Sequence, residues 1–223
     1  MGGISGPKQI FFIPGTDYAI TETIINTWGI MLILIIISYI LGKSLKKVPD
    51  GKQNIAEMLV DGIYNLVDQT MGEDKRAFAP YIGTLMIFLI FANLSGLFGV
   101  RPPTADVNTT FALAIITFVL THYFGAKKNG VGGYLKGFLE PIPALLPLNI
   151  IGELANPISL SFRLFGNIVG GLIIMQLLYG ALGFFSVIPV PAMLHMYFDV
   201  FSGVLQSFIF SMLTMVFIAM AMD

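Results

Sequence analysis

The chain contains the stretch Pro157-Ile158-Ser159-Leu160-Ser161-Phe162-Arg163-Leu164-Phe165-Gly166-Asn167-Ile168-Val169-Gly170-Gly171. This stretch lies inside a largely apolar run from about Leu148 to Phe185, which is longer than the roughly 20 residues that a helix needs to cross a bilayer. The guanidinium of Arg163 stays protonated at any physiological pH. At the centre of a transmembrane helix it costs about 2.5 to 3.5 kcal/mol on insertion scales. Because such a residue is rarely kept for packing, Arg163 is a candidate functional residue.

Polar side chains are expected on the same helical face as Arg163. Residues four apart on a helix lie one above the other, which places Asn167 on this face, and Asn156 falls close to the same line two turns earlier. A second polar stripe, at spacings i, i+4, i+7 and i+11, comprises His195, Asp199, Ser202 and Gln206. In lipid such a stripe has to face protein or water. If the two segments form an antiparallel hairpin, we expect a polar seam in which Gln206 is hydrogen-bonded to Arg163.

The composition is that of an integral membrane protein. Of the 223 residues, 56% are hydrophobic and only 11% are charged, whereas soluble domains carry about 25% charged residues. The net charge of -1 gives no field that would attract nucleic acid. The absence of cysteine excludes disulfides, thiolate metal sites and a cysteine nucleophile. With no zinc-protease or nucleotide-loop motif present, we expect no catalytic residue, no metal and no cofactor.

The hydropathy pattern predicts an all-α fold with five membrane crossings in a single membrane domain, residues 1–223. Residues 54–71 show apolar side chains at three-to-four residue spacing opposite acidic ones, which predicts an amphipathic helix on the membrane surface. The other segments are an outer polar leader at 1–23, with no removable signal peptide, crossings at 24–41, 80–100 and 107–124, and two long segments at 148–185 and 191–222. A glycine-rich loop with Lys127, Lys128 and Lys136 is expected after the third crossing. A proline-rich break follows it, and Pro189 and Pro191 form the turn between the long segments.

The distribution of lysines predicts the orientation. The connector after the first crossing carries four lysines and the one after the third carries three, whereas residues 101–106 hold a single basic residue. The positive-inside rule then places the lysine-rich connectors in the cytoplasm. The N-terminus is expected outside and the C-terminus inside.

The two C-terminal segments are too long to stand upright in a bilayer. At 1.5 Å per residue they would measure roughly 55 and 48 Å, against a hydrocarbon core of about 30 Å. We therefore expect a hairpin of two strongly tilted helices, which presents a long lateral face to a partner.

Two motifs resemble those of a known family. Leu160-Ser161-Phe162-Arg163-Leu164-Phe165-Gly166-Asn167, followed by Gly170-Gly171, is similar to the signature of subunit a of the F-type ATP synthases, and the stretch from Asp199 to Phe210 resembles its last helix. The likeness extends from Asn26-Thr27-Trp28 to the C-terminus. It implies the stator half of a membrane motor, without catalytic activity of its own, in a bacterial plasma membrane. The implied partners are a ring of c subunits facing Arg163, the peripheral-stalk b subunits, the rest of the complex and the lipid.

The resemblance also implies roles for the polar residues. Arg163 would hold each passing ring carboxylate ionised, and two half-channels would carry H⁺ or Na⁺ to and from the ring. The candidates for ion translocation are Arg163, Asn167, Asp199, Gln206, His195, Glu153, Asn156 and Ser202, and those for close helix packing are Gly166, Gly170 and Gly171. One position departs from the family pattern, because Leu172 stands where members commonly have a polar or ionisable residue. His195 is a candidate substitute.

Other interpretations remain open from the residues alone. Arg163 could form a structural ion pair with Asp199 or Glu153, and Asn167 and Gln206 could be simple interhelical hydrogen-bond partners. Glu153, near the start of its helix, could interact with the helix dipole. The chain could instead be a secondary transporter with an anion or substrate site at Arg163, although no internal repeat is found, or a membrane scaffold.

Overall fold

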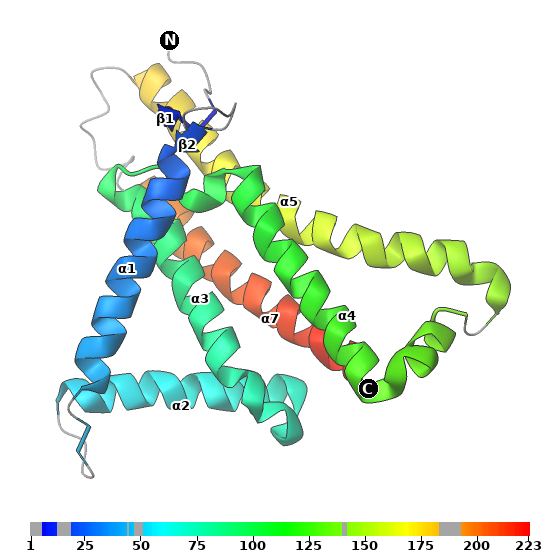
Figure 1. The fold of residues 1–223 in the computed structure, drawn as a ribbon. Coiled ribbons are helices and arrows are strands. Elements are labelled where there is room, and N and C mark those ends of the chain that lie inside the picture. The colour runs from blue at the N-terminus through cyan, green and yellow to red at the C-terminus, as the bar shows by residue number, and fades with distance from the viewer. Residues whose placement is uncertain (1–5, 13–18, 44, 47–50, 140–141, 183–192) are drawn as a thin grey trace.

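The computed structural model describes residues 6–12, 19–43, 45–46, 51–139, 142–182 and 193–223 (Figure 1). Five helical segments are long and apolar enough to cross a membrane: Glu22–Gly42, Glu73–Phe98, Val107–Gly137, Pro143–Ala181 and Met193–Met222. They confirm the prediction of an all-α polytopic membrane protein. The predicted turn at Pro189 and Pro191 lies outside the described residues, as do Glu140 and Pro141 of the proline-rich break.

The helices have the following bounds. The long ones are α1 (Glu22–Gly42), α2 (Lys52–Met71), α3 (Ala79–Leu94), α4 (Val107–Gly137), α5 (Leu146–Leu182) and α7 (Ser202–Met222). Short 3₁₀ turns are η1 (Glu73–Phe78), η2 (Ser95–Phe98), η3 (Pro103–Ala105) and η4 (Pro143–Leu145), and a π-helical turn, η6 (Met196–Phe201), precedes α7. Part of the expected leader forms a two-stranded antiparallel sheet of β1 (Gln9–Phe12) and β2 (Ala19–Thr21), which was not predicted from the sequence.

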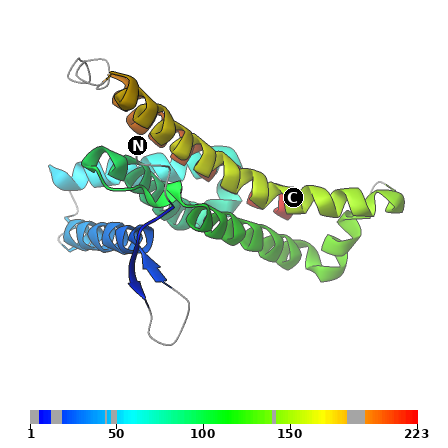
Figure 2. The ribbon, with the colours of Figure 1, turned by 90° about the horizontal axis from the view of Figure 1, so that it is seen from above.

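The long helices are arranged as a bundle with one helix across its end. In Figure 1, α1 and α3 run steeply, α2 crosses below them, and α7 runs obliquely behind α4. Figure 2 shows α5 extending along α7 and beyond α4. α7 contacts α3, α4 and α5, so it is the central helix of the bundle.

Helix α2 is held by the apolar face that the sequence predicted. Ile63, Val67 and Met71 are buried against Ile82 of α3 and Met215 of α7, in one cluster of the core. Asp61, on the other side of α2, is exposed. This arrangement fits a helix that lies along the membrane surface.

The second cluster of the core fixes the rotation of α5. Leu160 and Leu164 are 2% and 0% exposed, and they pack against Leu89 of α3, Ala114 of α4 and Phe210 of α7. Side chains four apart lie on one face of a helix. Ser161 is also buried, whereas Phe162 and Arg163 are exposed and turned away from the core.

The glycine-rich stretch after the third crossing is helical, contrary to the prediction of a loop. α4 continues past Phe124 to Gly137, and only Gly130, with φ 70° and ψ 150°, departs from helical geometry inside it. The positive φ suits glycine, and it bends the helix so that Tyr134 returns towards Gly125. A Cβ at Gly125 would lie 2.8 Å from the carbonyl oxygen of Ala221, so this position requires glycine.

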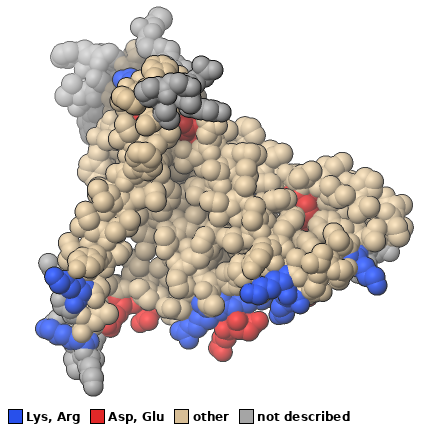
Figure 3. All heavy atoms as spheres, in the orientation of Figure 1, with Lys and Arg blue, Asp and Glu red and all other residues tan. Residues whose placement is uncertain are grey.

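Most of the basic side chains visible in Figure 3 lie along the lower edge of the molecule, the edge at which α2 lies. Lys75 at this edge is buried and donates to the Asp223 carboxylate at 2.5 Å. The hydrogen bond and charge of Lys75 lower the pKa of Asp223 below its usual value. A carboxyl with a lowered folded pKa contributes stability above its ordinary pKa and loses it as the pH falls through the lowered value. The ion pair between Lys75 of η1 and Asp223 after α7 is therefore intact at neutral pH.

Asn93 joins three elements at the other end of the bundle. Its Nδ2 donates to the carbonyl of Gly203 at 2.9 Å and to Ser207 Oγ at 2.8 Å, and its Oδ1 accepts from Thr104 Oγ1 at 2.6 Å. Asn93 itself is 2% exposed. Buried polar groups that lose a partner cost about 1 to 3 kcal/mol.

We expect Asn93→Leu to destabilise the protein by about 1 to 3 kcal/mol, because Thr104 and Ser207 would lose their common partner. The measurement is the thermal midpoint of the purified protein in detergent. Thr84→Ala is the matched control, since the exposed Thr84 hydroxyl donates only to Pro80 of its own helix. Equal midpoints for the two variants would contradict a structural role for Asn93.

Candidate functional site

Arg163 lies near the middle of α5 and on its exposed side. The residue and its neighbour Phe162 are exposed, Phe162 at 57%, whereas Leu164 is fully buried. Within the described part of the chain, Arg163 makes no ion pair and no hydrogen bond. The structure thus presents a permanent positive charge on a lateral face.

The alternative of an ion pair between Arg163 and either acidic candidate is not found in the structure. Asp199 is bonded to His195 and Glu153 to Asn156. The expected hydrogen bond between Gln206 and Arg163 is also absent among the described residues, because Asn167 Nδ2 donates to Gln206 Oε1 at 2.6 Å. Asn167 lies on α5 one turn beyond Arg163, and its amide occupies the Gln206 oxygen that Arg163 was expected to bind.

Gln206 is 1% exposed, and its Nε2 has no partner among the described residues. An unsatisfied buried donor costs roughly 1 to 3 kcal/mol. The Asn167–Gln206 pair therefore leaves a buried amide donor close to the Arg163 face. Among the described residues, the Asn167–Gln206 pair is the one hydrogen bond that joins the two predicted polar stripes.

A second group of polar residues lies where η6 meets α5. Tyr179 Oη is 2.8 Å from His195 Nε2, and His195 Nδ1 is 2.5 Å from Asp199 Oδ2. Because hydrogen bonds in the π-helical turn join residues five apart, it holds more residues per turn than an α-helix, so the predicted stripe does not continue in phase from His195 to Gln206. Ser202, at the junction, is half-buried and makes no hydrogen bond through its side chain in the described part of the chain.

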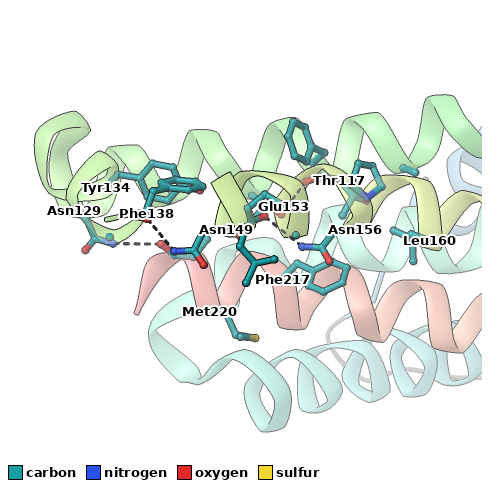
Figure 4. Close-up of a pocket in the computed structure, with 18 of the residues that line it drawn as sticks. Thr117, Asn129, Tyr134, Phe138, Asn149, Glu153, Asn156, Leu160, Phe217 and Met220 are labelled. Carbon is teal, nitrogen blue, oxygen red and sulfur yellow. Dashed lines mark hydrogen bonds between the residues drawn. The ribbon is translucent and has the colours of Figure 1, made fainter. Parts of the chain in front are cut away.

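A pocket of about 990 Å³ opens between α4, α5 and α7 (Figure 4). Two of the predicted residues line it, Glu153 and Asn156, and Asn156 Nδ2 is 3.3 Å from Glu153 Oε2. Figure 4 shows both on the α5 wall, with Asn149 beside them and Thr117 on α4. The pocket thus brings polar side chains of α4 and α5 together with apolar side chains near the end of α7.

Sequence reasoning missed the part of this pocket that α4 supplies. Its polar residues are Thr117, Thr121, Asn129 and Tyr134. A signal was present, because Thr110, Thr117 and Thr121 recur at i, i+7 and i+11, which is one helical face. The end of this helix was missed because residues beyond Phe124 were taken for a loop.

The three candidate packing glycines differ in their surroundings. A Cβ on Gly171 would lie 3.4 Å from Phe198 Cβ, which is ordinary contact with η6, whereas Gly166 and Gly170 face open space. Within the described chain, only Gly171 therefore adjoins another helix closely. Gly166 instead leaves the Arg163 face without a projecting side chain.

Comparison with known proteins agrees with this architecture. The sequence model of the family described as ATP synthase A chain matches residues 24–219. A relative in Propionigenium modestum, described as ATP synthase subunit a, sodium ion specific, is 37% identical over 96% of this chain and 84% of its own length. The ATP synthase subunit a of Moorella thermoacetica is 39% identical, covering 96% of this chain and 95% of the relative, and that of Trichlorobacter lovleyi is 42% identical, covering 90% and 86%.

Both the match over nearly the whole chain and the five apolar helices fit a membrane subunit of the ATP synthase complex. The chain therefore belongs to the ATP synthase A chain family.

Proposed function

We propose that the chain is the ion-translocating stator subunit of an F-type ATP synthase, in which Arg163 faces the c ring between two half-channels. The observation that carries the proposal is the exposed position of Arg163 near the middle of α5, with no partner among the described residues. A guanidinium facing lipid there would cost about 2.5 to 3.5 kcal/mol on insertion scales. A partner that brings a carboxylate to this face would remove that cost.

The inner half-channel is assigned to the pocket that Glu153 and Asn156 line. Its 990 Å³ volume admits water, and its polar walls can hydrate an ion. The outer half-channel is assigned to the group around Asp199 and His195. Along α5, Arg163 is about 15 Å from Glu153 and about 24 Å from Tyr179 at 1.5 Å per residue, so it separates the two routes.

This arrangement couples ion flow to rotation. An ion from the outer route neutralises a ring carboxylate, which can then face lipid, whereas a carboxylate approaching Arg163 is favoured in its ionised form and releases its ion to the inner route. Each elementary charge that crosses yields about 2.3 kcal/mol per 100 mV. The chain performs no covalent step, and ATP is made in the soluble head of the complex.

The orientation and the remaining partners follow the same proposal. The lysine-rich edge at α2 faces the cytoplasm of a bacterial cell, and the start of α1 faces outside. The b subunits of the peripheral stalk complete the stator. α1 is available for contact with lipid or another chain, since only 6% of the residues in its apolar stretch are buried inside the chain.

A cysteine cross-link tests which face meets the ring. The chain contains no cysteine, so Gly166→Cys introduces a single thiol on the Arg163 face, where a side chain has open space. We expect it to form a cross-link with a cysteine in the outer helix of the c subunit in the assembled complex. The product is detected as a shifted band that both subunits share.

Leu32→Cys on α1 is the matched control, because Leu32 is 59% exposed on a membrane-spanning helix that lies apart from α5. It should give no product with the c subunit. Cross-linking from α1 but not from Gly166 would overturn the proposed docking face.

A further inference from the structure

We propose that the outer half-channel conducts protons rather than Na⁺, through a hydrogen-bonded relay of Tyr179, His195 and Asp199. The inference rests on the proposed stator function and adds both the ion and the residue Tyr179. The chain of contacts is continuous, from Tyr179 Oη to His195 Nε2 at 2.8 Å and from His195 Nδ1 to Asp199 Oδ2 at 2.5 Å. The imidazole ring bridges two elements, α5 and η6, with both of its nitrogens engaged.

The relay runs from the surface towards the interior. Tyr179 is 41% exposed. The side chain of His195 is 36% exposed and that of Asp199 only 13%. Tyr179 and His195 therefore lie at the open end of the relay, and the Asp199 carboxylate lies at its shielded end.

One transfer balances as follows. A hydronium ion gives a proton to Tyr179 Oη, the tyrosine hydroxyl proton passes to His195 Nε2, and the Nδ1 proton passes to Asp199 Oδ2. Tyr179 and His195 end neutral, the imidazole in its other tautomer, and Asp199 carries the added proton. Asp199 then gives this proton to the ring carboxylate. The half-exposed His195 returns to its starting tautomer when Nδ1 takes a proton from water and Nε2 releases one, so no net proton is added or lost in this step.

Na⁺ has no comparable route through this group. Like other hard cations it takes oxygen ligands, but the oxygens of Tyr179 and Asp199 lie on opposite sides of an imidazole ring. The described residues include no group of three or more His, Cys, Asp or Glu side chains that could hold a metal ion. An imidazole between two oxygens passes a proton from one nitrogen to the other, and it blocks a sodium ion.

Few other titratable groups act on this relay. α3 also packs against η6, and the only titratable side chain in its range Ala79–Leu94 is Tyr81, near the opposite end. Tyr197, on the turn itself, is 56% exposed and stacks on Phe201. The sequence between Gly183 and Ala192 contains no titratable residue.

The relay also accounts for Leu172, the position at which the sequence departs from the family pattern. Because Leu172 is apolar, it can neither donate a proton to Asp199 nor accept one from it. In this chain the partner of Asp199 is His195, one turn earlier in the same membrane segment, with Nδ1 2.5 Å from Asp199 Oδ2. The hydrogen bond to Asp199 thus comes from its own segment and not from position 172 of α5.

The test uses the whole ATP synthase complex in vesicles and follows ATP-driven proton uptake and radioactive sodium uptake in parallel. We expect His195→Gln to slow proton uptake by about 100-fold, the lower end of what a positioned proton-transfer group contributes. Tyr179→Phe, which removes only the hydroxyl that contacts His195 Nε2, should slow it by a smaller factor. Tyr197→Phe is the matched control and should behave as wild type.

Three results would overturn the relay. They are sodium uptake by the wild-type complex that a protonophore does not affect, wild-type proton uptake by His195→Gln, and equal effects of Tyr179→Phe and Tyr197→Phe. Each variant is first checked for assembly by co-purification of the c subunit, and Tyr179→Phe serves if His195→Gln fails to assemble. Arg163→Ala is measured alongside. Coupled ion transport by Arg163→Ala would contradict the stator function itself. Loss of coupling in Arg163→Ala, with wild-type proton uptake in the Tyr179 and His195 variants, would refute only the relay.

Discussion

Arg163→Ala is expected to abolish ion-driven ATP synthesis while the complex stays assembled. Without the guanidinium, a ring carboxylate passing the α5 face meets no fixed positive charge, so it is not held ionised and does not release its ion to the inner route. The barrier to a direct leak between the two routes disappears with it, because a cation in transit would no longer pass a fixed charge in low dielectric. The measurement is the rate of ATP synthesis in reconstituted vesicles under an imposed ion gradient. We expect this rate to fall to that of vesicles treated with an uncoupler.

Assembly should survive this change because Arg163 contributes no contact to the core of the chain. Leu160 and Leu164, which hold α5 against its neighbours, are untouched. Phe162→Leu is the matched control, since Phe162 is 57% exposed beside Arg163 and carries no charge, and it should retain synthesis. Arg163→Lys should also fail in large part, because a lysine ammonium can lose its proton in a desolvated site whereas a guanidinium cannot. Coupled synthesis by Arg163→Ala would refute the motor function proposed for this chain.

Asp199→Asn has the second largest expected effect. Asparagine keeps an oxygen that can accept from His195 Nδ1, so the local hydrogen bond and the packing of η6 persist. It cannot take up a proton, however, and ion flux should fall by about 100-fold or more, as expected when a positioned proton-transfer group is lost. The readout is the passive flux of protons through the membrane sector after the soluble head has been removed.

Asp106→Asn makes the same chemical change at a structural site. Asp106 caps α4 by accepting from Asn108 N at 3.0 Å, and it also accepts from Thr23 Oγ1 at 3.0 Å. Asparagine is as good an N-cap as aspartate, so flux and assembly should both be close to wild type. If Asp199→Asn matches this control in flux, Asp199 is only a packing residue.

Most of the fold could be predicted from the sequence because lipid imposes a simple rule. In the hydrocarbon layer every backbone polar group has to be bonded within a helix or barrel, so each long apolar run becomes a helix. The run that contains Arg163 was identified in this way. The amphipathic helix at residues 54–71 was identified from the three-to-four residue spacing of its apolar side chains. Arg163 itself stood out because a permanent charge is rare in such a run.

The departures arise where contacts between helices decide the structure. The extension of α4 beyond Phe124 depends on Gly125 meeting the end of α7 and on Tyr134 packing back after the bend at Gly130. Nothing in local propensity favours a helix there, since glycine is a weak helix former. The pocket near Glu153 was missed for the same reason, because one of its walls lies on this extension.

The partners of the polar residues were the least predictable part of the site. Helical spacing placed Arg163, Asn167 and Gln206 near one another, but it could not say which amide Gln206 would meet. The relative rotation of α5 and α7 decides in favour of Asn167. For Ser202 the spacing argument assumed an α-helix through residues that form a π-helical turn.

The π-helical turn divides the last membrane segment into two parts, and the side chains of one part are rotated about the helix axis relative to those of the other. Each residue of an α-helix advances the chain by about 100°, so the wider turn at Met196–Phe201 shifts His195 around the axis relative to Gln206. Removing one residue from the turn would convert it to ordinary helix and swing the histidine away from Tyr179, while everything after Ser202 kept its place. The number of residues between His195 and Gln206 is therefore as specific a requirement as the residues themselves.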